Sequence, residues 1–317
     1  MSLRPVSSLA EELRRRGART VALQLPAGLK RRGYTIAKDL RAAGFDVIIS
    51  GDPCYGACDL ALETLEVADV LVHFGHAPVG AHDRVIHEPV SMDFDPGVVR
   101  EALPLLQGPR IGLVTTVQHV HMLDTVAEEL RRAGLEPVVA GGSGRTPHPG
   151  QVLGCSFRAA RETGAREILY VGTGLFHPLG VQLATGARVV ALDPYTGQAT
   201  VVSAERFLRQ RFGLIERARD AERIGIIISS KSGQRRLDLA RRLAGLSDGT
   251  VLVMMREVTP EALLDLGCDA YVNTACPRLA YDDQARFPVP VLTPAEFEII
   301  LGIRSWEDYV ADEWGGE

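Results

Sequence analysis

Three cysteines lie in loops of the same kind, and they are the residues whose chemistry is most informative. Their local sequences are Tyr55-Gly56-Ala57-Cys58, Leu153-Gly154-Cys155-Ser156 and Thr274-Ala275-Cys276-Pro277. Thiolates select zinc, copper(I) or iron–sulfur clusters. Three thiols in equivalent places therefore predict that Cys58, Cys155 and Cys276 converge on one soft metal centre. The alternative is three similar domains that each bury an incidental cysteine, because free cysteine often acts as a small core hydrophobe.

The spacing of the cysteines limits which kind of metal site they can form. Structural zinc sites often use Cys-x2-Cys pairs, and the sequence contains none. Three distant thiols suit a four-iron cluster in which one iron lacks a protein thiolate and is open to substrate. Cys54 and Cys58 begin the common radical S-adenosylmethionine motif, but Ala61 stands where its third cysteine belongs. We therefore interpret Cys54 as a neighbour of the site and Cys268 as a core residue at the end of a helix.

Strands and helices alternate in three copies of one unit. The expected strands are residues 21–25, 45–49, 70–74, 111–114, 136–139, 168–171, 224–228, 250–254 and 270–273, and the expected helices are 33–43, 122–133 and 235–244. Alternation of this kind favours right-handed βαβ crossovers and parallel sheets. The predicted fold is α/β, with three similar parallel-sheet domains at residues 1–105, 106–218 and 219–317. In the third copy the last strand precedes its cysteine, so the repeat is imperfect there.

Polar residues gather where several of these strands end. Ligands of parallel sheets bind beyond the carboxyl ends of the strands, so residues there are candidates for cofactor binding. The candidates are His73, His76, Gln118, His119, Gly172, His177, Lys231 and Gln234. Lys231 belongs to a Lys-Ser-Gly-Gln turn that could bind a carboxylate or a phosphate. A single loop histidine is more often solvated and idle.

Composition excludes several classes of protein. The formal net charge of -5 gives no basic footprint, so we expect no nucleic-acid partner. No stretch approaches the roughly 18 apolar residues of a membrane span, and the first 16 residues lack the apolar core of a signal peptide. Five scattered cysteines argue against a disulfide framework and for a reducing cytoplasm.

Several motifs taken together resemble a known family. They are Gln24-Leu25-Pro26-Ala27-Gly28-Leu29, Gly51-Asp52-Pro53-Cys54-Tyr55-Gly56-Ala57-Cys58-Asp59, His73-Phe74-Gly75-His76, Gly154-Cys155 and Asn273-Thr274-Ala275-Cys276-Pro277-Arg278. With these motifs nearly the whole chain resembles the archaeal diphthamide synthase family, the 2-(3-amino-3-carboxypropyl)histidine synthases. Ala27 stands where that family commonly has glutamate. The resemblance adds Gln24 and Gly28 to the candidates for cofactor binding.

The resemblance implies a fold arrangement, a cofactor and a reaction. It implies a homodimer of three-domain subunits with pseudo-threefold symmetry, in which each domain supplies one cysteine to a 4Fe-4S cluster. The fourth iron binds S-adenosylmethionine, and an electron from an external donor cleaves the bond to its aminocarboxypropyl chain. The resulting radical adds to a histidine of elongation factor 2, the first step of diphthamide biosynthesis, and methylthioadenosine is released.

Two other classes remain open. A dehydratase like quinolinate synthase also combines a three-cysteine cluster with three α/β domains, although the loops of Cys58 and Cys276 argue against it. A non-enzymatic accessory protein would hold a cluster without consuming S-adenosylmethionine.

Overall fold

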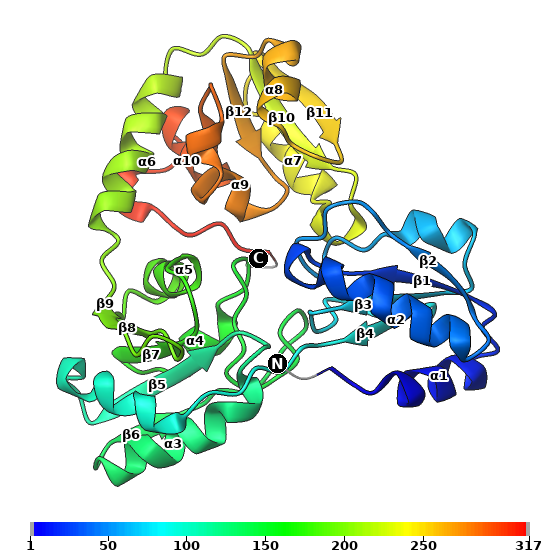
Figure 1. Cartoon of the computed structure of the whole chain (residues 1–317). Helices are drawn as coiled ribbons and strands as arrows, with labels where there is room; N and C mark the ends of the chain where they lie inside the picture. The colour runs from blue at the N-terminus through cyan, green and yellow to red at the C-terminus, as the bar shows by residue number, and fades with distance from the viewer. Residues whose placement is uncertain (1–2, 315–317) are drawn as a thin grey trace.

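Three α/β units, each built on its own sheet, surround a common centre (Figure 1). The computed structural model describes residues 3–314. The strand orders are β2-β1-β3-β4, β6-β5-β7-β8-β9 and β11-β10-β12-β13. In every unit the first strand therefore lies between the second and the third. This is the α/β architecture of three similar sheets that the sequence predicts.

The first unit is a parallel sheet with helices on one face. Its strands are β1 (Thr20–Gln24), β2 (Asp46–Ile49), β3 (Val70–Phe74) and β4 (Val85–Glu88), and its helices are α1 (Val6–Arg15) and α2 (Lys30–Ala42). Side chains such as Leu13, Leu40 and Val72 form a core between the helices and the sheet. The opposite face packs Leu71 against the segment before β3.

The second unit has helices on both faces and one antiparallel strand at its edge. Its strands are β5 (Arg110–Thr115), β6 (Glu136–Val138), β7 (Glu167–Val171), β8 (Arg188–Leu192) and β9 (Ala199–Val201), and its helices are α3 (Leu123–Arg132), α4 (Arg158–Glu162) and α5 (Phe176–Thr185). Only β9 runs antiparallel to its neighbour, β8. Alternate residues of β5 face the two cores, Leu113 with α3 and Val114 with α4 and α5.

The third unit repeats the same strand order. Its strands are β10 (Ile224–Ser229), β11 (Thr250–Met255), β12 (Ala270–Asn273) and β13 (Val291–Leu292), and its helices are α6 (Glu205–Ala218), α7 (Leu237–Ala244), α8 (Pro260–Leu266), α9 (Pro277–Tyr281) and α10 (Pro294–Ile300). Strand β10 is apolar on both faces, as expected of a parallel strand covered on both sides. Ile226 packs toward α7 and α10, and Ile227 toward α8 and α9.

Short 3-10 helices complete the chain. They are Ala27–Leu29, Leu62–Glu66, Pro96–Glu101, Leu103–Leu105, Val120–Met122, Ser232–Gln234, Gln284–Arg286 and Trp306–Asp308. The predicted strands and helices are confirmed to within a few residues at each end. Gly44 and Gly134, which follow α2 and α3, have φ of +97° and +81°, the left-handed conformation that ends helices.

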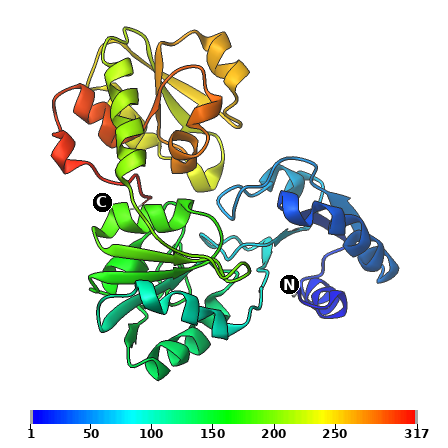
Figure 2. The ribbon, with the colours of Figure 1, turned by 60° about the vertical axis from the view of Figure 1, so that its left-hand side comes forward.

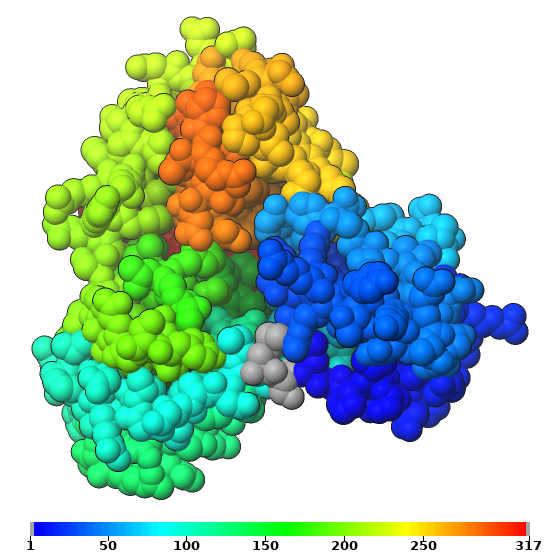
Figure 3. Space-filling view, viewed as in Figure 1, coloured from blue at the N-terminus to red at the C-terminus, as the bar shows by residue number. Residues whose placement is uncertain are grey.

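The units are connected by contacts between segments distant in sequence. Helix α6 packs against α10 and β13 and so belongs to the third unit, although its residues fall within 106–218, the range predicted for the second domain. The C-terminal segment then runs from α10 back to the second unit, where Trp314 bonds to the Cys155 loop (Figures 1 and 2). The space-filling view is hollowed where the three units meet (Figure 3). The predicted domain boundaries stay predictions.

A search of the helices in residues 3–314 finds none that is both long and apolar enough to cross a membrane.

Candidate metal centre

The loop of Cys58 crosses the carboxyl end of β1. Gln24, the last residue of β1, donates from Nε2 to the carbonyl oxygen of Asp59 at 2.6 Å. Its Oε1 accepts the backbone N–H of Ala61 at 3.1 Å. Both ends of this buried amide are thus bonded to the loop, which fixes the orientation of the amide and places Cys58 above the sheet.

The loop of Cys155 lies in the equivalent place of the second unit. The backbone N–H of Val152 donates to the carbonyl oxygen of Thr115, the last residue of β5, at 2.8 Å. Gly154 is required before the cysteine, because a Cβ there would lie 2.0 Å from Cε1 of Phe176. The N–H of Trp314, near the chain end, donates to the carbonyl oxygen of Cys155 at 2.8 Å.

Cys276 differs, because it follows the third strand of its unit instead of preceding it. It lies between β12 and α9, where Asn273 donates from Nδ2 to its carbonyl oxygen at 2.8 Å. Thr274 donates from Oγ1 to the carbonyl oxygen of Ile227 in β10 at 2.7 Å. The structure thus reproduces the irregularity of the third repeat and still places Cys276 at the carboxyl end of its sheet.

Contacts between the units gather at the turn of residues 231–234. A Cβ on Gly233 of the third unit would lie 2.5 Å from Cα of Cys58 in the first. Gln234 donates from Nε2 to Sγ of Cys58 at 3.3 Å. Arg145 of the second unit donates to the carbonyl oxygen of Gly233 at 3.0 Å. All three units therefore meet at the Lys-Ser-Gly-Gln turn.

The pKa values of the three thiols respond to one another's charge as well as to burial. Burial, followed by the charges of Cys58 and Cys155, raises the pKa of Cys276 to about 12. Burial raises the pKa of Cys155 to about 11, with a further increase from Cys58 and an opposing effect of Arg145. Burial also raises the pKa of Cys58, against the hydrogen bond from Gln234. Each thiol is thus within electrostatic reach of another unit's thiol.

This donor set fits a cluster of soft metal ions. Without metal the three thiols hold their protons at neutral pH, and metal binding would release those protons. Arg145 and Arg236 lie close enough to Cys155 to favour its thiolate. Hydrogen bonds and charges of this kind tune the potential of iron–sulfur clusters.

A cavity of about 190 Å³ adjoins Cys276 between the first and third units. Its charged lining is mostly cationic and consists of Lys231, Arg256, Arg278, Arg286, Glu257 and Asp283. Tyr55 and Gln234 also line it. All four cations pair with carboxylates. Arg278 and Arg286 have the longest pairs, 3.4 Å to Asp282 and 3.7 Å to Asp283, so these two are the ones that could take the anionic end of a small molecule beside the thiol.

Lys231 is held more firmly than the sequence suggests. Its Nζ lies 3.0 Å from Oδ2 of Asp59 and 2.7 Å from Oε1 of Glu257. Burial disfavours the ammonium, but the bonds to Glu257 and Asp59 outweigh it and raise the pKa of Lys231. The lysine is thus a charged connection between the first and third units, with both carboxylates already bonded to it.

Gln24, His73 and His76 form one chain of hydrogen bonds inside the first unit. Nδ1 of His73 lies 2.8 Å from Oε1 of Gln24, and Nε2 of His73 lies 3.0 Å from Nδ1 of His76. None of the three lines the cavity beside Cys276. Gly28 lies in the exposed 3-10 helix after β1 and does not line it either.

The remaining candidates belong to the second unit. Gln118 donates from Nε2 to the carbonyl oxygen of Gly75 at 3.4 Å, and Nε2 of His119 lies 2.9 Å from the Tyr195 hydroxyl. Gly172 is buried, and its N–H donates to Leu192. Burial and then the charge of Arg278, which lines the cavity beside Cys276, lower the pKa of His177 to about 4.

Several residues around the thiols were not predicted from the sequence. Arg145, Arg236 and Trp314 are the main ones, and Arg145 lies 4.4 Å from the ring centroid of Trp314. Arg236 lies two residues after Gln234, and Asp59 ends the Cys58 motif, so nearness to a motif was a usable signal for both. Nothing in the sequence indicates that Trp314 returns to the second unit.

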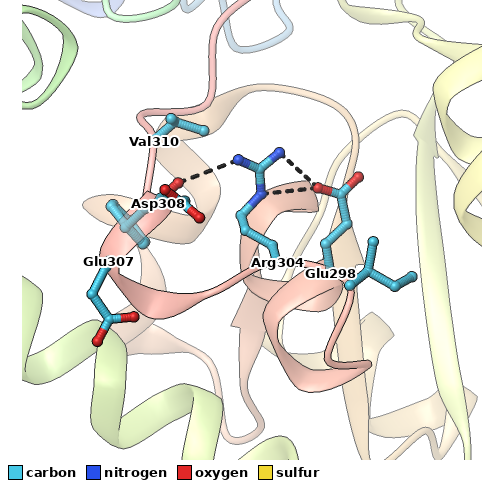
Figure 4. Close-up of a pocket in the computed structure, with 7 residues that line it drawn as sticks. Glu298, Arg304, Glu307, Asp308 and Val310 are labelled. Atoms are coloured by element: carbon cyan, nitrogen blue, oxygen red, sulfur yellow. Dashed lines mark hydrogen bonds and ion pairs between the residues drawn. The ribbon is translucent and has the colours of Figure 1, made fainter.

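A wider hollow lies at the C-terminal segment, apart from the cysteines (Figure 4). Arg304 there donates to Oε2 of Glu298 at 2.9 and 3.0 Å and to the carbonyl oxygen of Asp308 at 3.2 Å. These groups satisfy one another, and no cysteine lines the hollow.

The fold and the centre define an α/β protein whose three sheets each direct one cysteine loop to a shared site. Comparison with known proteins gives the family. The model of the family described as "Putative diphthamide synthesis protein" matches residues 25–310. The chain therefore belongs to the diphthamide synthesis family.

Known relatives align over almost the whole chain. The chain is 37% identical to 2-(3-amino-3-carboxypropyl)histidine synthase of Pyrococcus horikoshii, over 98% of this chain and 93% of that protein. It is 34% identical to subunit 1 of the human synthase, over 94% of this chain and 72% of the relative. The crystal structure of Dph2 from P. horikoshii with a 4Fe-4S cluster superposes with a TM-score of 0.93 and 37% identity, covering 98% of this chain and 93% of that one.

Proposed function

We propose that this protein transfers the 3-amino-3-carboxypropyl group of S-adenosylmethionine to a histidine of elongation factor 2, with a 4Fe-4S cluster held by Cys58, Cys155 and Cys276. The observation that carries the proposal is the meeting of three cysteine loops from three sheets at one centre. Family membership and the 4Fe-4S cluster bound by Dph2 of P. horikoshii agree with this donor set.

When bound, the cluster would supply the electron that cleaves S-adenosylmethionine and an iron without a protein thiolate for its amino-acid end. The side chains of this protein position and enclose the reactants. Arg278 and Arg286 line the cavity beside Cys276 and suit the carboxylate of the methionine part. Lys231 is bonded to Asp59 and Glu257, so we assign it to holding the first and third units together.

The partner substrate is a protein loop, which the opening between three units suits better than a sealed pocket. An electron donor must also reach the centre. We place the reaction in the reducing cytoplasm, where cysteines stay available as ligands.

We also propose that the protein is a homodimer that pairs through the exposed edges of its sheets. Strands β2 and β11 are edge strands with apolar side chains on the surface, among them Ile49, Val251 and Met254, which is 60% exposed. An open apolar edge is a natural place for association.

The double variant Val251→Lys/Met254→Lys tests this interface, and it should sediment as a monomer. Tyr34→Lys is the surface control and should stay a dimer. An unchanged dimer in the double variant would exclude β11 as the interface.

The transfer itself can be followed with labelled S-adenosylmethionine. Under anaerobic reducing conditions, label in the aminocarboxypropyl carbons should appear on elongation factor 2, and label in the methyl group should stay with methylthioadenosine. Replacement of the target histidine should abolish the transfer. Intact S-adenosylmethionine together with formation of quinolinate would favour the dehydratase, and a cluster without either reaction would favour an accessory protein.

A further inference from the structure

A second group of soft ligands lies in the first unit, beside the three-cysteine centre. Cys54, His73 and His76 each offer one possible ligand atom, and these three atoms all lie within 4.8 Å of one another. Cys54 and His73 are buried, and His76 is half-buried. We propose that these three residues form a separate mononuclear site that binds Zn²⁺.

The hydrogen bonds around His73 fix its tautomer. Oε1 of Gln24 accepts from the N–H of Ala61, and Nε2 of Gln24 donates to the carbonyl oxygen of Asp59, so the amide cannot be flipped. The oxygen that faces Nδ1 of His73 can only accept, so Nδ1 carries the proton. Nε2 of His73 is therefore unprotonated, and its lone pair faces His76.

This arrangement is the one that metal-binding histidines normally have. A ligating imidazole usually donates its other N–H to a carbonyl or carboxylate oxygen, which orients the ring. Gln24 supplies that oxygen to His73. Burial, followed by the neighbouring imidazoles, lowers the pKa of His73 to about 2, and burial lowers that of His76 to about 4, so both rings are neutral as ligands must be.

The backbone places His76 back against His73. Gly75 between them has φ of +94°, which turns the chain sharply at the end of β3. Nδ1 of His76 then lies 3.0 Å from Nε2 of His73. Tetrahedral zinc with Zn–N bonds of about 2.0–2.1 Å needs its nitrogens only a few tenths of an ångström further apart. Small side-chain shifts, together with movement of the His76 proton from Nδ1 to Nε2, would therefore admit the ion.

One thiolate and two imidazoles are typical zinc ligands, and a fourth position remains for water or another side chain. His87 is the nearest further imidazole: its ring centroid lies 5.4 Å from that of His73. Within residues 3–314, neither ring nitrogen of His87 has a hydrogen-bond partner. Zinc here would tie the start of the Cys58 loop to the end of β3.

Metal analysis of the cluster-loaded, full-length protein tests the site. After incubation with one equivalent of Zn²⁺ and desalting, the wild type should retain about one zinc per chain in addition to its iron. Cys54→Ala and His76→Ala should weaken zinc binding by more than about 100-fold, because loss of even an outer partner costs roughly 10–100-fold. Iron should stay bound in both variants, which separates this site from the three-cysteine centre.

Cys268→Ala and His82→Ala are the matched controls, since Cys268 packs in the third unit and His82 is exposed. Both should retain zinc. A wild type that keeps no zinc, or a Cys54→Ala/His76→Ala double variant that keeps it, would overturn the proposal.

A spectroscopic test with cobalt keeps the proposal testable if one of the zinc-site variants fails to fold. The variant Cys58→Ala/Cys155→Ala/Cys276→Ala, which lacks the cluster thiols, should bind one Co²⁺ and show a thiolate-to-cobalt charge-transfer band. The additional change Cys54→Ser should remove that band. A cobalt spectrum without thiolate character, in triple-variant protein that circular dichroism shows to be folded, would contradict the proposal.

Discussion

The loops of Cys58 and Cys155 occupy equivalent places in their units but are held in different ways. The Cys58 loop is fixed by buried side chains: Gln24 from its own unit, and Lys231 and Gln234 from the third. The Cys155 loop is fixed by backbone hydrogen bonds and by the C-terminal segment, through the Trp314 N–H and the Glu313 carboxylate, which accepts from the N–H of Phe157. The same repeat thus depends on a buried ion pair in one copy and on the C-terminal segment in the other.

The largest loss of cluster and activity should come from replacing the thiols themselves, and the Cys58 and Cys155 loops should not differ in this. Cys58→Ala, Cys155→Ala and Cys276→Ala should each lose the intact cluster and its transferase activity, because a cluster held by three thiolates has none to spare. Iron content and visible absorption after anaerobic reconstitution measure this. Cys268→Ala is the control and should retain a full cluster. A full cluster in any of the three single variants would remove that cysteine from the ligand set.

The buried ion pair should matter next, and only to the Cys58 side. Lys231→Met leaves the buried carboxylate of Asp59 without its cation, and breaking such a pair typically costs about 3–5 kcal/mol. Asp59→Asn should cost less, because Lys231 keeps Glu257 as a partner at 2.7 Å. Urea unfolding of the metal-free protein gives both free energies of unfolding.

The double variant Asp59→Asn/Lys231→Met serves as the control for this pair. It removes both charges and should recover much of the stability lost in Lys231→Met. Equal losses in the two single variants would show that Glu257 does not share the lysine.

The C-terminal contact should have a smaller effect, confined to the Cys155 side. Trp314→Ala removes the ring that Arg145 covers, a contact worth roughly 0.5–2 kcal/mol. In metal-free protein Cys155 should then be alkylated faster, and Cys58 should not, as mass spectrometry can measure. Trp306→Ala is the matched control, since Trp306 packs against Phe212 in the third unit. Equal acceleration at both cysteines would mean that the C-terminal segment holds the whole centre.

A separate effect concerns pH and appears only in alkaline solution. Burial raises the pKa of Cys155 and of Cys276 above the ordinary 9.0, to about 11 and about 12. The folded metal-free protein therefore holds these protons more tightly than the unfolded chain, and its stability is full below pH 9 and falls as pH rises toward 12. The Cys155→Ala/Cys276→Ala variant should lose less stability over this range. An identical pH dependence would contradict the raised pKa values.

The sequence predicts the sheets well because burial on both faces leaves a clear signal. The run Ile224–Ile228 is apolar throughout and becomes β10. Strands β4, β8, β9 and β13 were not predicted; of these, β9 and β13 have only three and two residues, too few to show a periodicity. Their place is decided by the neighbouring strands to which they pair.

The functional site also has parts that the sequence predicts and parts that it does not. The cysteines were visible because three copies repeat one pattern, and the repeat survives the shifted position of Cys276. The return of Trp314 to the Cys155 loop was not visible, because it depends on how the third unit lies against the second. The pairing of Lys231 with Asp59 was hidden for the same reason: the two residues come from different units.

The most direct test of the central claim is an anaerobic crystal structure of the reconstituted protein with an anomalous map measured at the iron edge. We predict four irons at the meeting point of the three units, bonded to Cys58, Cys155 and Cys276, with the fourth iron free of protein thiolates. Iron bonded to Cys54 or Cys268, or thiols of the three loops that lie apart without a shared cluster, would contradict the account.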